Sequence, residues 1–449
     1  MGTTRKAAHL ATGVLEDYER ARVPTAEGRS YVGLTLIFLG ICIAIPSLLL
    51  GSALVAGMGL KRAITATLWG CLVGTPICLL ASHVGTRSRF STAMTLKFAF
   101  GSAGAKIISV IIAVDMFCWF AVNTEIFGTS LRYAATSIWN AQLSKSVLCV
   151  VAGALMTVVT IFGYRSVEKF AFLAVPLLAT VLFTYLFYSL TKTRFSEVLA
   201  RPAFGQPMSY PTGISIVAGT FGSVCVLLPD FTRYSKNAAH AASAVILGLS
   251  LGFPPFVLIG SYLAAATREP DFVKVMLMYG WGPAAVLVIA LTCWIHMNTD
   301  LYSASLNLAA IIPRTQKWKL TAFAGLAGTT VALFGLVGRY VSFLIILSVV
   351  LPPIAGVYTA DYLLRRRLYR SGQSDGMTRF RPVGLGALVV GVVVGFMTAP
   401  RGEMGFGLFR LTFLPAIDSF LASFLCLLAF EKTASLWVQG ESETLDESA

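Results

Sequence analysis

Charged residues are scarce in this chain. Aspartate, glutamate, lysine and arginine make up 12% of its 449 residues, whereas hydrophobic residues make up 56%. Soluble domains carry roughly 25% charged residues, so this composition excludes an ordinary water-exposed globular protein. Short segments of alternating polarity, typical of barrel strands, are also absent. Apolar runs of about 20 residues recur instead, which is the length that a helix needs to cross a bilayer.

Metal-binding patterns are absent as well. The eight cysteines all lie in apolar runs, none at C-x-x-C spacing, and we expect them to be small apolar filler. Of only four histidines, His296 alone lies deep in an apolar run. An intramembrane enzyme needs a nucleophile–base pair or a metal set, so we expect no enzyme, no metal and no cofactor. The polar N-terminal segment lacks the apolar core of a cleavable signal peptide, and the first span is expected to direct insertion.

The apolar runs predict an all-α polytopic membrane protein with twelve membrane-spanning helices. Lysine and arginine are concentrated in one set of alternate loops, which predicts that both termini are cytoplasmic. This distribution explains the net charge of +14 by membrane orientation rather than by binding to nucleic acid. The expected location is the inner (plasma) membrane. The predicted spans are approximately 31–53, 62–82, 103–128, 146–163, 168–190, 212–229, 241–266, 283–310, 319–336, 340–362, 383–399 and 410–430.

Two predicted spans contain helix-disturbing residues near their middle. The first has Pro46-Ser47 at its centre, and the sixth has Gly219, Gly222 and Ser223. Interrupted membrane helices are tolerated where the freed backbone groups are buried or line a cavity. Two of them five spans apart indicate inverted repeats with a binding site between them. The ordinary enrichment of glycine and proline in membrane helices explains the same residues equally well.

The third predicted span places three polar or aromatic residues on one face. Asp115, Trp119 and Asn123 stand at four-residue intervals. A ring flanked by hydrogen-bonding groups suits a flat ligand, because the ring stacks on the ligand face and the amide reads its edge. The alternative is that Trp119 packs and Asn123 bonds between helices. Asp115 is either functional or a structural partner of a broken helix, since burying a carboxylate is costly.

The eighth predicted span is unusually polar. His296 and Asp300 are four residues apart, as are Thr299 and Ser303. Ionisable residues inside a membrane indicate function by default. We expect Asp300, Asn298 and Thr299 to reach a ligand or a coupling ion. His296 either pairs with Asp300, carries a coupling proton, or is a neutral hydrogen-bonded side chain.

The sixth predicted span offers a second ring. Phe221 could stack on the opposite face of the same ligand, while backbone at Gly222 and the hydroxyl of Ser223 bond to its edge. Alone, Phe221 is explained by core packing. Asp230 and Arg233, which follow in LPDFTRYSKN, are interpreted as structural or gating residues.

Several segments resemble the nucleobase:cation symporter-1 family, and its cytosine permease branch above all. They are DYERARVPTAEGRSYVG before the first span, RFSTAMTLKFAFGSAGAKI and CWFAVNTEIFG at the third, PDFTRY after the sixth and LYSASLNLA in the eighth. The resemblance covers nearly the whole chain. It implies the inverted-repeat fold of the neurotransmitter–sodium symporters, with helices 1 and 6 interrupted. It also implies alternating access around a site formed by spans 1, 3, 6 and 8.

The resemblance divides the chain into five parts. Residues 1–30 form a cytoplasmic N-terminal segment, 31–190 the first repeat of five spans, and 212–362 the second repeat. Residues 383–430 form two additional helices, and 431–449 a cytoplasmic acidic tail.

Site residues also follow from the resemblance. Trp119 matches the stacking tryptophan, Asn123 falls where the hydantoin-carrying relative has a ligand-reading glutamine, and Asp300 falls near a ligand-binding asparagine. Cytosine permeases usually carry a glutamine where this chain has Met116, so the substrate could differ from cytosine. The predicted substrate-binding residues are Trp119, Asn123, Phe221, Gly222, Ser223, Asn298 and Asp300.

The coupling ion stays open between Na+ and H+. Sodium-using members carry a TTN-like stretch where this chain reads Ile295-His296-Met297, and isoleucine and methionine provide no hard oxygen ligands. Backbone carbonyls from Ala44 to Ser47 with hydroxyls of the eighth span could still bind sodium, whereas His296 or Asp300 could carry a proton. The candidate ion-coupling residues are Ala44, Ser47, Asp115, His296, Thr299 and Ser303.

The sequence therefore predicts a secondary active importer of a small planar nitrogen heterocycle, with cytosine or a related nucleobase first. Hydantoin, allantoin, purines and hydroxymethylpyrimidine are alternative substrates. A membrane receptor that binds without transport is a different class that the sequence leaves open. The expected partners are the heterocycle and the lipid bilayer, and the oligomeric state is undetermined.

Overall fold

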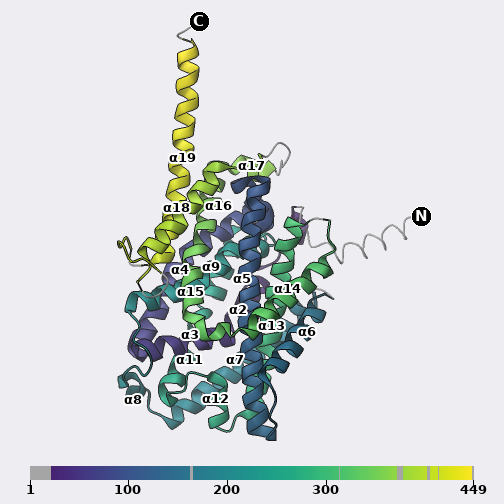
Figure 1. The fold of residues 1–449 in the computed structure, drawn as a ribbon, viewed down its shortest axis with the longest axis vertical. Coiled ribbons are helices and arrows are strands. Elements are labelled where there is room, and N and C mark those ends of the chain that lie inside the picture. The colour runs from purple at the N-terminus through teal and green to yellow at the C-terminus, as the bar shows by residue number, and fades with distance from the viewer. Residues whose placement is uncertain are drawn as a thin grey trace, which may run out of the picture.

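The computed structural model describes residues 22–161, 165–312, 314–371, 378–401, 405–412 and 414–446, and within them every regular element is a helix (Figure 1). Most predicted spans correspond to a single helix. These are α4 (Leu60–Ser88), α5 (Thr92–Trp139), α6 (Lys145–Ile161), α7 (Arg165–Lys192), α9 (Tyr210–Thr232), α13 (Gly282–Ile311), α14 (Lys317–Leu333), α18 (Pro382–Thr398) and α19 (Pro415–Asp446).

Three spans are built from consecutive pieces. The first comprises α2 (Tyr31–Cys42) and α3 (Ile45–Met58). The seventh comprises α10 (Ala238–Ala244), the π-helical η2 (Val245–Ser250) and α11 (Phe253–Thr267), and the tenth η3 (Leu336–Arg339), α15 (Tyr340–Val350) and α16 (Pro352–Leu364). The connecting elements are η1 (Thr25–Glu27), α8 (Phe195–Ala200), α12 (Phe272–Met278) and α17 (Arg366–Ser371).

The membrane character of the chain is confirmed. Seven helices of the described residues are long and apolar enough to cross a bilayer, and an eighth is added when α2 and α3 count as one bent span. α6 and α18 are shorter apolar helices at two more predicted positions. The exact number of twelve spans stays a prediction.

The predicted break in the first span is confirmed, but it lies slightly earlier than expected. α2 and α3 meet at 53°. The non-helical residues are Ile43 and Ala44, whereas Pro46 lies in the first turn of α3. Proline is favoured there because the first N–H groups of a helix have no intrahelical partner. The end of α2 and the start of α3 thus meet in a buried place, where Ile43 is 1% exposed and Ala44 is 4% exposed.

The predicted interruption of the sixth span is wrong for this structure. α9 runs continuously from Tyr210 to Thr232. A Cβ atom at Gly219 would lie 2.8 Å from the carbonyl oxygen of Leu344, and one at Gly222 would lie 3.2 Å from that of Leu347. The glycines therefore permit close packing of α9 against α15, and glycine alone costs a helix only about 1 kcal/mol.

Helix contacts repeat between the two halves of the chain. α3 of the first span packs along α11 of the seventh, and α9 of the sixth packs along α4 of the second. α5 packs along α13, and α6 along α14. Exchanging each span with the one five places later leaves these pairings unchanged, as inverted repeats require. In Figure 1, α5 runs the length of the bundle beside α13, while α19 projects beyond it.

Candidate functional site

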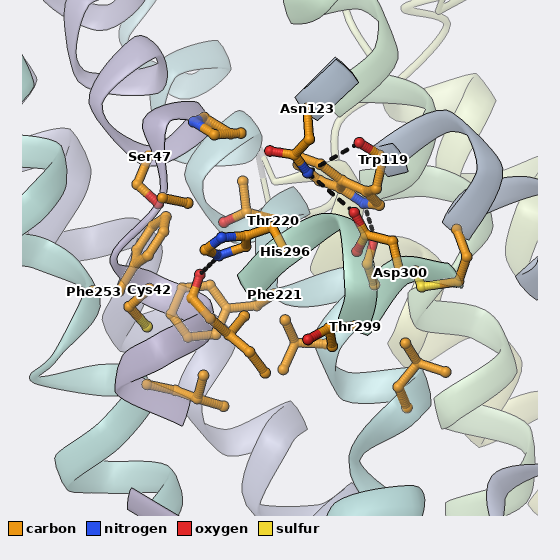
Figure 2. Close-up of a pocket in the computed structure, with 18 of the residues that line it drawn as sticks. Cys42, Ser47, Trp119, Asn123, Thr220, Phe221, Phe253, His296, Thr299 and Asp300 are labelled. Carbon is orange, nitrogen blue, oxygen red and sulfur yellow. Dashed lines mark hydrogen bonds between the residues drawn. The ribbon is translucent and has the colours of Figure 1, made fainter. Parts of the chain in front are cut away.

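A cavity of about 120 Å³ lies at the break of the first span. α2, α3, α5, α9 and α13 supply most of its wall, and η2, α11 and α15 contribute one residue each. Most of the predicted site residues meet there although they are far apart in sequence (Figure 2). The predicted residues that line the cavity are Ala44, Ser47, Trp119, Asn123, Phe221, Ser223, His296, Thr299, Asp300 and Ser303.

Trp119 is held by a chain of hydrogen bonds from α5 to α9. Its indole Nε1–H donates to Ser223 Oγ at 3.0 Å, and the Ser223 hydroxyl donates to Asp115 Oδ1 at 3.2 Å. Asp115 lies one turn before Trp119 and is 5% exposed. The carboxylate thus acts on the ring through the serine and does not line the cavity. The ring edge also contacts Phe343 at a centroid distance of 5.2 Å.

Asn123 and Asp300 form the polar edge of the cavity. The Asn123 Nδ2 group donates to the Trp119 carbonyl and to Asp300 Oδ2, both at 3.0 Å (Figure 2). Neither Asp300 nor Asp115 forms an ion pair with any basic residue of the described ranges. The cavity thus contains an acidic side chain that forms no ion pair within the described residues, next to an indole ring.

Phe221 supplies the second ring. It is 5% exposed, projects from α9 into the cavity wall, and packs edge-on against Phe253 of α11 at 5.6 Å between centroids. Trp119 and Phe221 thus line one cavity from two different helices. An aromatic ring on each of two walls suits a flat ligand.

His296 bridges α13 and the end of α2. Its Nδ1 lies 2.8 Å from the carbonyl oxygen of Thr292, and its Nε2 lies 3.0 Å from that of Ile41. The side chain is 8% exposed. Because α2 ends one residue after Ile41, this carbonyl has no intrahelical partner. The expected pairing of His296 with Asp300 is not observed.

Two predicted substrate residues lie elsewhere. Asn298 is fully buried, accepts a hydrogen bond from Thr160 of α6 at 2.6 Å and donates to the Trp294 carbonyl. It stands about 200° around α13 from Asp300, so it faces α6. Gly222 faces α15, as described above. Helix periodicity explains both placements, because neighbours along a helix point in different directions.

The hydroxyl candidates for ion coupling, Ser47, Thr299 and Ser303, all line the cavity. Thr299 donates to its own helix at Ile295, 2.8 Å away. The Ala44 carbonyl accepts from the N–H groups of Ser47 and Leu48 at the start of α3.

Asp230 accepts from the Thr92 N–H at 2.8 Å at the beginning of α5, which supports its structural interpretation.

Tyr340, which lies at the start of α15, was not among the predicted site residues. Its hydroxyl donates to the Pro46 carbonyl at 3.0 Å, and its ring packs edge-on against Trp119. Met116 lines the wall one turn before Trp119, at the position where cytosine permeases usually carry a glutamine. Nothing local in the sequence relates Tyr340 to Pro46, because 294 residues separate them.

The bent first span, the repeated helix contacts and the central cavity define a membrane transporter of the inverted-repeat class. Residues 26–398 match the family described as permeases for cytosine/purines, uracil, thiamine and allantoin, and the chain belongs to this family. Membership confirms the predicted family and identifies the protein as a transporter rather than an enzyme.

Individual relatives carry related names. The cytosine permease of Escherichia coli (strain K12) is 27% identical over 379 residues, which cover 84% of this chain and 88% of the relative. The hydantoin permease of Microbacterium maritypicum is 22% identical over 411 residues, covering 84% of each chain.

Solved structures confirm the predicted fold. A nucleobase-cation-symport-1 family transporter, closed with bromovinylhydantoin bound, matches with a TM-score of 0.79 at 20% identity, over 93% of this chain and 96% of that one. A Na+-coupled sialic acid symporter matches with a TM-score of 0.62 at 13% identity, over 94% of each chain.

Proposed function

We propose that this protein imports a small planar nitrogen heterocycle, with cytosine or a related nucleobase as the leading substrate, by cation-coupled alternating access. The observation that carries the proposal is the meeting of Trp119, Asn123 and Asp300 in one cavity at the break of the first span. Membership of the cytosine and purine permease family supports this substrate class. Hydantoin and allantoin are alternatives, since relatives with those names also match.

In the proposed complex the heterocycle lies between the rings of Trp119 and Phe221. Its polar edge faces Asn123 and Asp300, and Met116 adds an apolar contact. Ring stacking binds any flat base, so it supplies affinity. The edge contacts supply selectivity, because a mismatched group leaves a buried polar atom without a partner.

The cation that we propose is a proton on His296. A neutral imidazole has one N–H, but both ring nitrogens of His296 face carbonyl oxygens, which only the protonated ring can satisfy together. A sodium ion would lack side-chain oxygen ligands at Ile295 and Met297, and the Ile41 carbonyl is already engaged. The titratable groups that line the cavity around His296 are Cys42 of α2, Asp300 of α13 and Tyr340 of α15.

Protonation of His296 would couple to movement of the first span. The protonated ring holds the end of α2 against α13 through the Ile41 carbonyl. If α2 moves away, the ring loses one acceptor, and a buried charge without hydrogen-bond partners is costly. Proton release would therefore accompany the change of access.

The division into parts also remains our proposal. Residues 1–30 and 431–449 are cytoplasmic, 31–190 and 212–362 form the two repeats, and 383–430 adds two helices. The position of the predicted repeats agrees with the mirrored helix contacts. The inner (plasma) membrane is the proposed location, and the helical continuation of α19 to Asp446 would extend into the cytoplasm.

Counterflow in proteoliposomes tests the function directly. Vesicles preloaded with unlabelled cytosine should accumulate labelled cytosine transiently, and unlabelled cytosine outside should block this. Exchange needs no ion gradient, so the identity of the cation does not affect the result. If neither cytosine nor any other heterocycle of a panel with hydantoin, allantoin and purines exchanges in folded protein, the receptor alternative replaces the transporter.

A further inference from the structure

Most hydrogen-bond donors of the residues that line the cavity already donate to other atoms of the protein. The Asn123 amide nitrogen faces the Trp119 carbonyl and an Asp300 oxygen, and both of these are acceptors. Its orientation is therefore fixed, because an amide oxygen in that place would meet two acceptors. Both Asn123 N–H groups are occupied, and Asn123 Oδ1 is the part of the amide left for a ligand.

The other donors of the wall are occupied in the same way. The Trp119 N–H donates to Ser223, and the Ser223 hydroxyl donates to Asp115. The hydroxyls of Thr220 and Thr299 donate to carbonyls of their own helices. Tyr340 donates to Pro46, as described above. The hydroxyls of Ser47 and Ser303 each bring acceptor lone pairs together with one donor, so they do not offset the excess of acceptors.

Two acceptors of the polar edge remain. No described residue donates to Asp300 Oδ1 or to Asn123 Oδ1, and the carboxylate has no basic partner in the described ranges. An unsatisfied carboxylate in an apolar site costs free energy until a donor reaches it. A ligand that brings N–H donors satisfies the ionised carboxylate.

We infer that Asp300, with Asn123, selects heterocycles that present a ring N–H beside an exocyclic amino group, an inference that rests on the proposed function. Two adjacent N–H donors match a carboxylate as a bidentate pair, because Asp300 Oδ1 is free and Oδ2 keeps a second lone pair beside the bond from Asn123. Isocytosine and guanine carry this edge. Uracil and xanthine have a carbonyl in place of the amino group, which would set an oxygen against the carboxylate. Neutral cytosine has an amino group beside an unprotonated ring nitrogen, so it should rank between the two groups.

Isosteric pairs test the inference in the purified protein. We would measure the concentration of each compound that half-blocks cytosine counterflow, and independently the rise in melting temperature that each causes. Isocytosine should act at a concentration about tenfold or more below uracil, and guanine likewise below xanthine. Equal potency within each pair would overturn the inference while leaving the transporter function intact.

Asp300→Asn tests the residue itself. An amide presents one acceptor and one donor, so the preference within each pair should shrink to less than about threefold. Glu269→Gln makes the same chemical change outside the cavity and should leave the preference unchanged. If Asp300→Asn is folded and keeps the full preference, Asp300 is not the selecting group. If the variant does not fold, the wild-type comparison of isosteric pairs still decides the inference. Absence of any heterocycle exchange would instead contradict the proposed function.

Discussion

The indole ring of Trp119 is positioned by a side chain from another helix. Ser223 of α9 accepts the indole N–H and passes a hydrogen bond on to Asp115. Ser223→Ala removes the acceptor and leaves a partly buried N–H without a partner, which costs about 1–3 kcal/mol. We expect heterocycle affinity to fall about tenfold, measured by the ligand-induced rise in melting temperature. Ser215→Ala on the same helix removes only a bond to the Pro211 carbonyl and should leave affinity unchanged.

Two substitutions of Trp119 separate stacking from hydrogen bonding. Trp119→Ala removes the ring and should weaken binding by about 2 kcal/mol, or ~30-fold. Trp119→Phe keeps a stacking surface but loses the N–H, so its loss should resemble that of Ser223→Ala. Both are measured by the same binding assay on protein that remains folded in membrane. Wild-type affinity in the alanine variant would contradict the proposed pose.

His296 gives a prediction about coupling rather than binding. His296→Gln keeps an N–H donor near the two carbonyls but cannot carry a proton. We expect counterflow within about threefold of wild type, because exchange needs no gradient, whereas accumulation driven by an inward proton gradient should be lost. Retained proton-driven accumulation would show that the histidine only holds α2 and α13 together. A sodium gradient applied to both proteins serves as the comparison.

At the same scale, helix periodicity accounts for what could be predicted. Trp119 and Asn123 share a face of α5, and His296, Asp300 and Ser303 share a face of α13, so their spacing was sufficient to place each set on one helix face. The family resemblance, and not the spacing, implied that the two faces meet at one site. Asn298 was predicted because it belongs to the polar run of the eighth span, but its side chain points toward α6 and not into the cavity. Tyr340 could not be found, because its partner is a backbone carbonyl on a distant span.

Among the helices, the predicted breaks of the first and sixth spans had different outcomes, because one rested on a proline and the other on glycines. Proline has a definite local consequence, since it lacks an N–H and favours the first turn of a helix. The break before Pro46 was therefore predictable to within a few residues. Glycine permits either a break or close packing, and only the position of α15 decides between them. The sequence alone could not reveal that Gly219 and Gly222 contact Leu344 and Leu347.

The α9–α15 contact yields a prediction at the level of helices. Gly219→Leu places a side chain where even a Cβ lies 2.8 Å from the Leu344 carbonyl oxygen and the Ser348 Cβ. α15 must move away, and we expect a loss of about 2 kcal/mol in stability together with weaker binding, because Tyr340 begins the same helix. The measurement is the melting temperature with and without ligand. Gly33→Leu on α2 is the matched control, since nothing lies within 4 Å of its Cβ position. Equal effects of the two substitutions would contradict the packing role of Gly219.

Across the whole molecule, a buried ionic cluster joins the second repeat to the additional helices. Asp361 of α16 is fully buried and accepts from Arg365 at 2.6 Å and from the Tyr369 hydroxyl at 2.7 Å. Arg381, just before α18, donates to Asp361 and pairs also with Glu431 of α19. The cluster thus connects α16, α17, α18 and α19 at the end of the bundle from which α19 projects (Figure 1).

Asp361→Asn leaves Arg365 beside a neutral partner and leaves Arg381 with Glu431 alone. Breaking a buried ion pair costs about 3–5 kcal/mol, because the remaining charge is uncompensated. We expect a clearly lower melting temperature, with counterflow and ligand preference retained in the protein that stays folded, since Asp361 does not line the cavity. Glu269→Gln disrupts a more exposed pair with Lys274 at 3.8 Å and should cost less than about 1 kcal/mol. If Asp361→Asn instead abolished exchange at full stability, the additional helices would take part in transport, and the boundary between the repeats and residues 383–430 would lose its functional meaning.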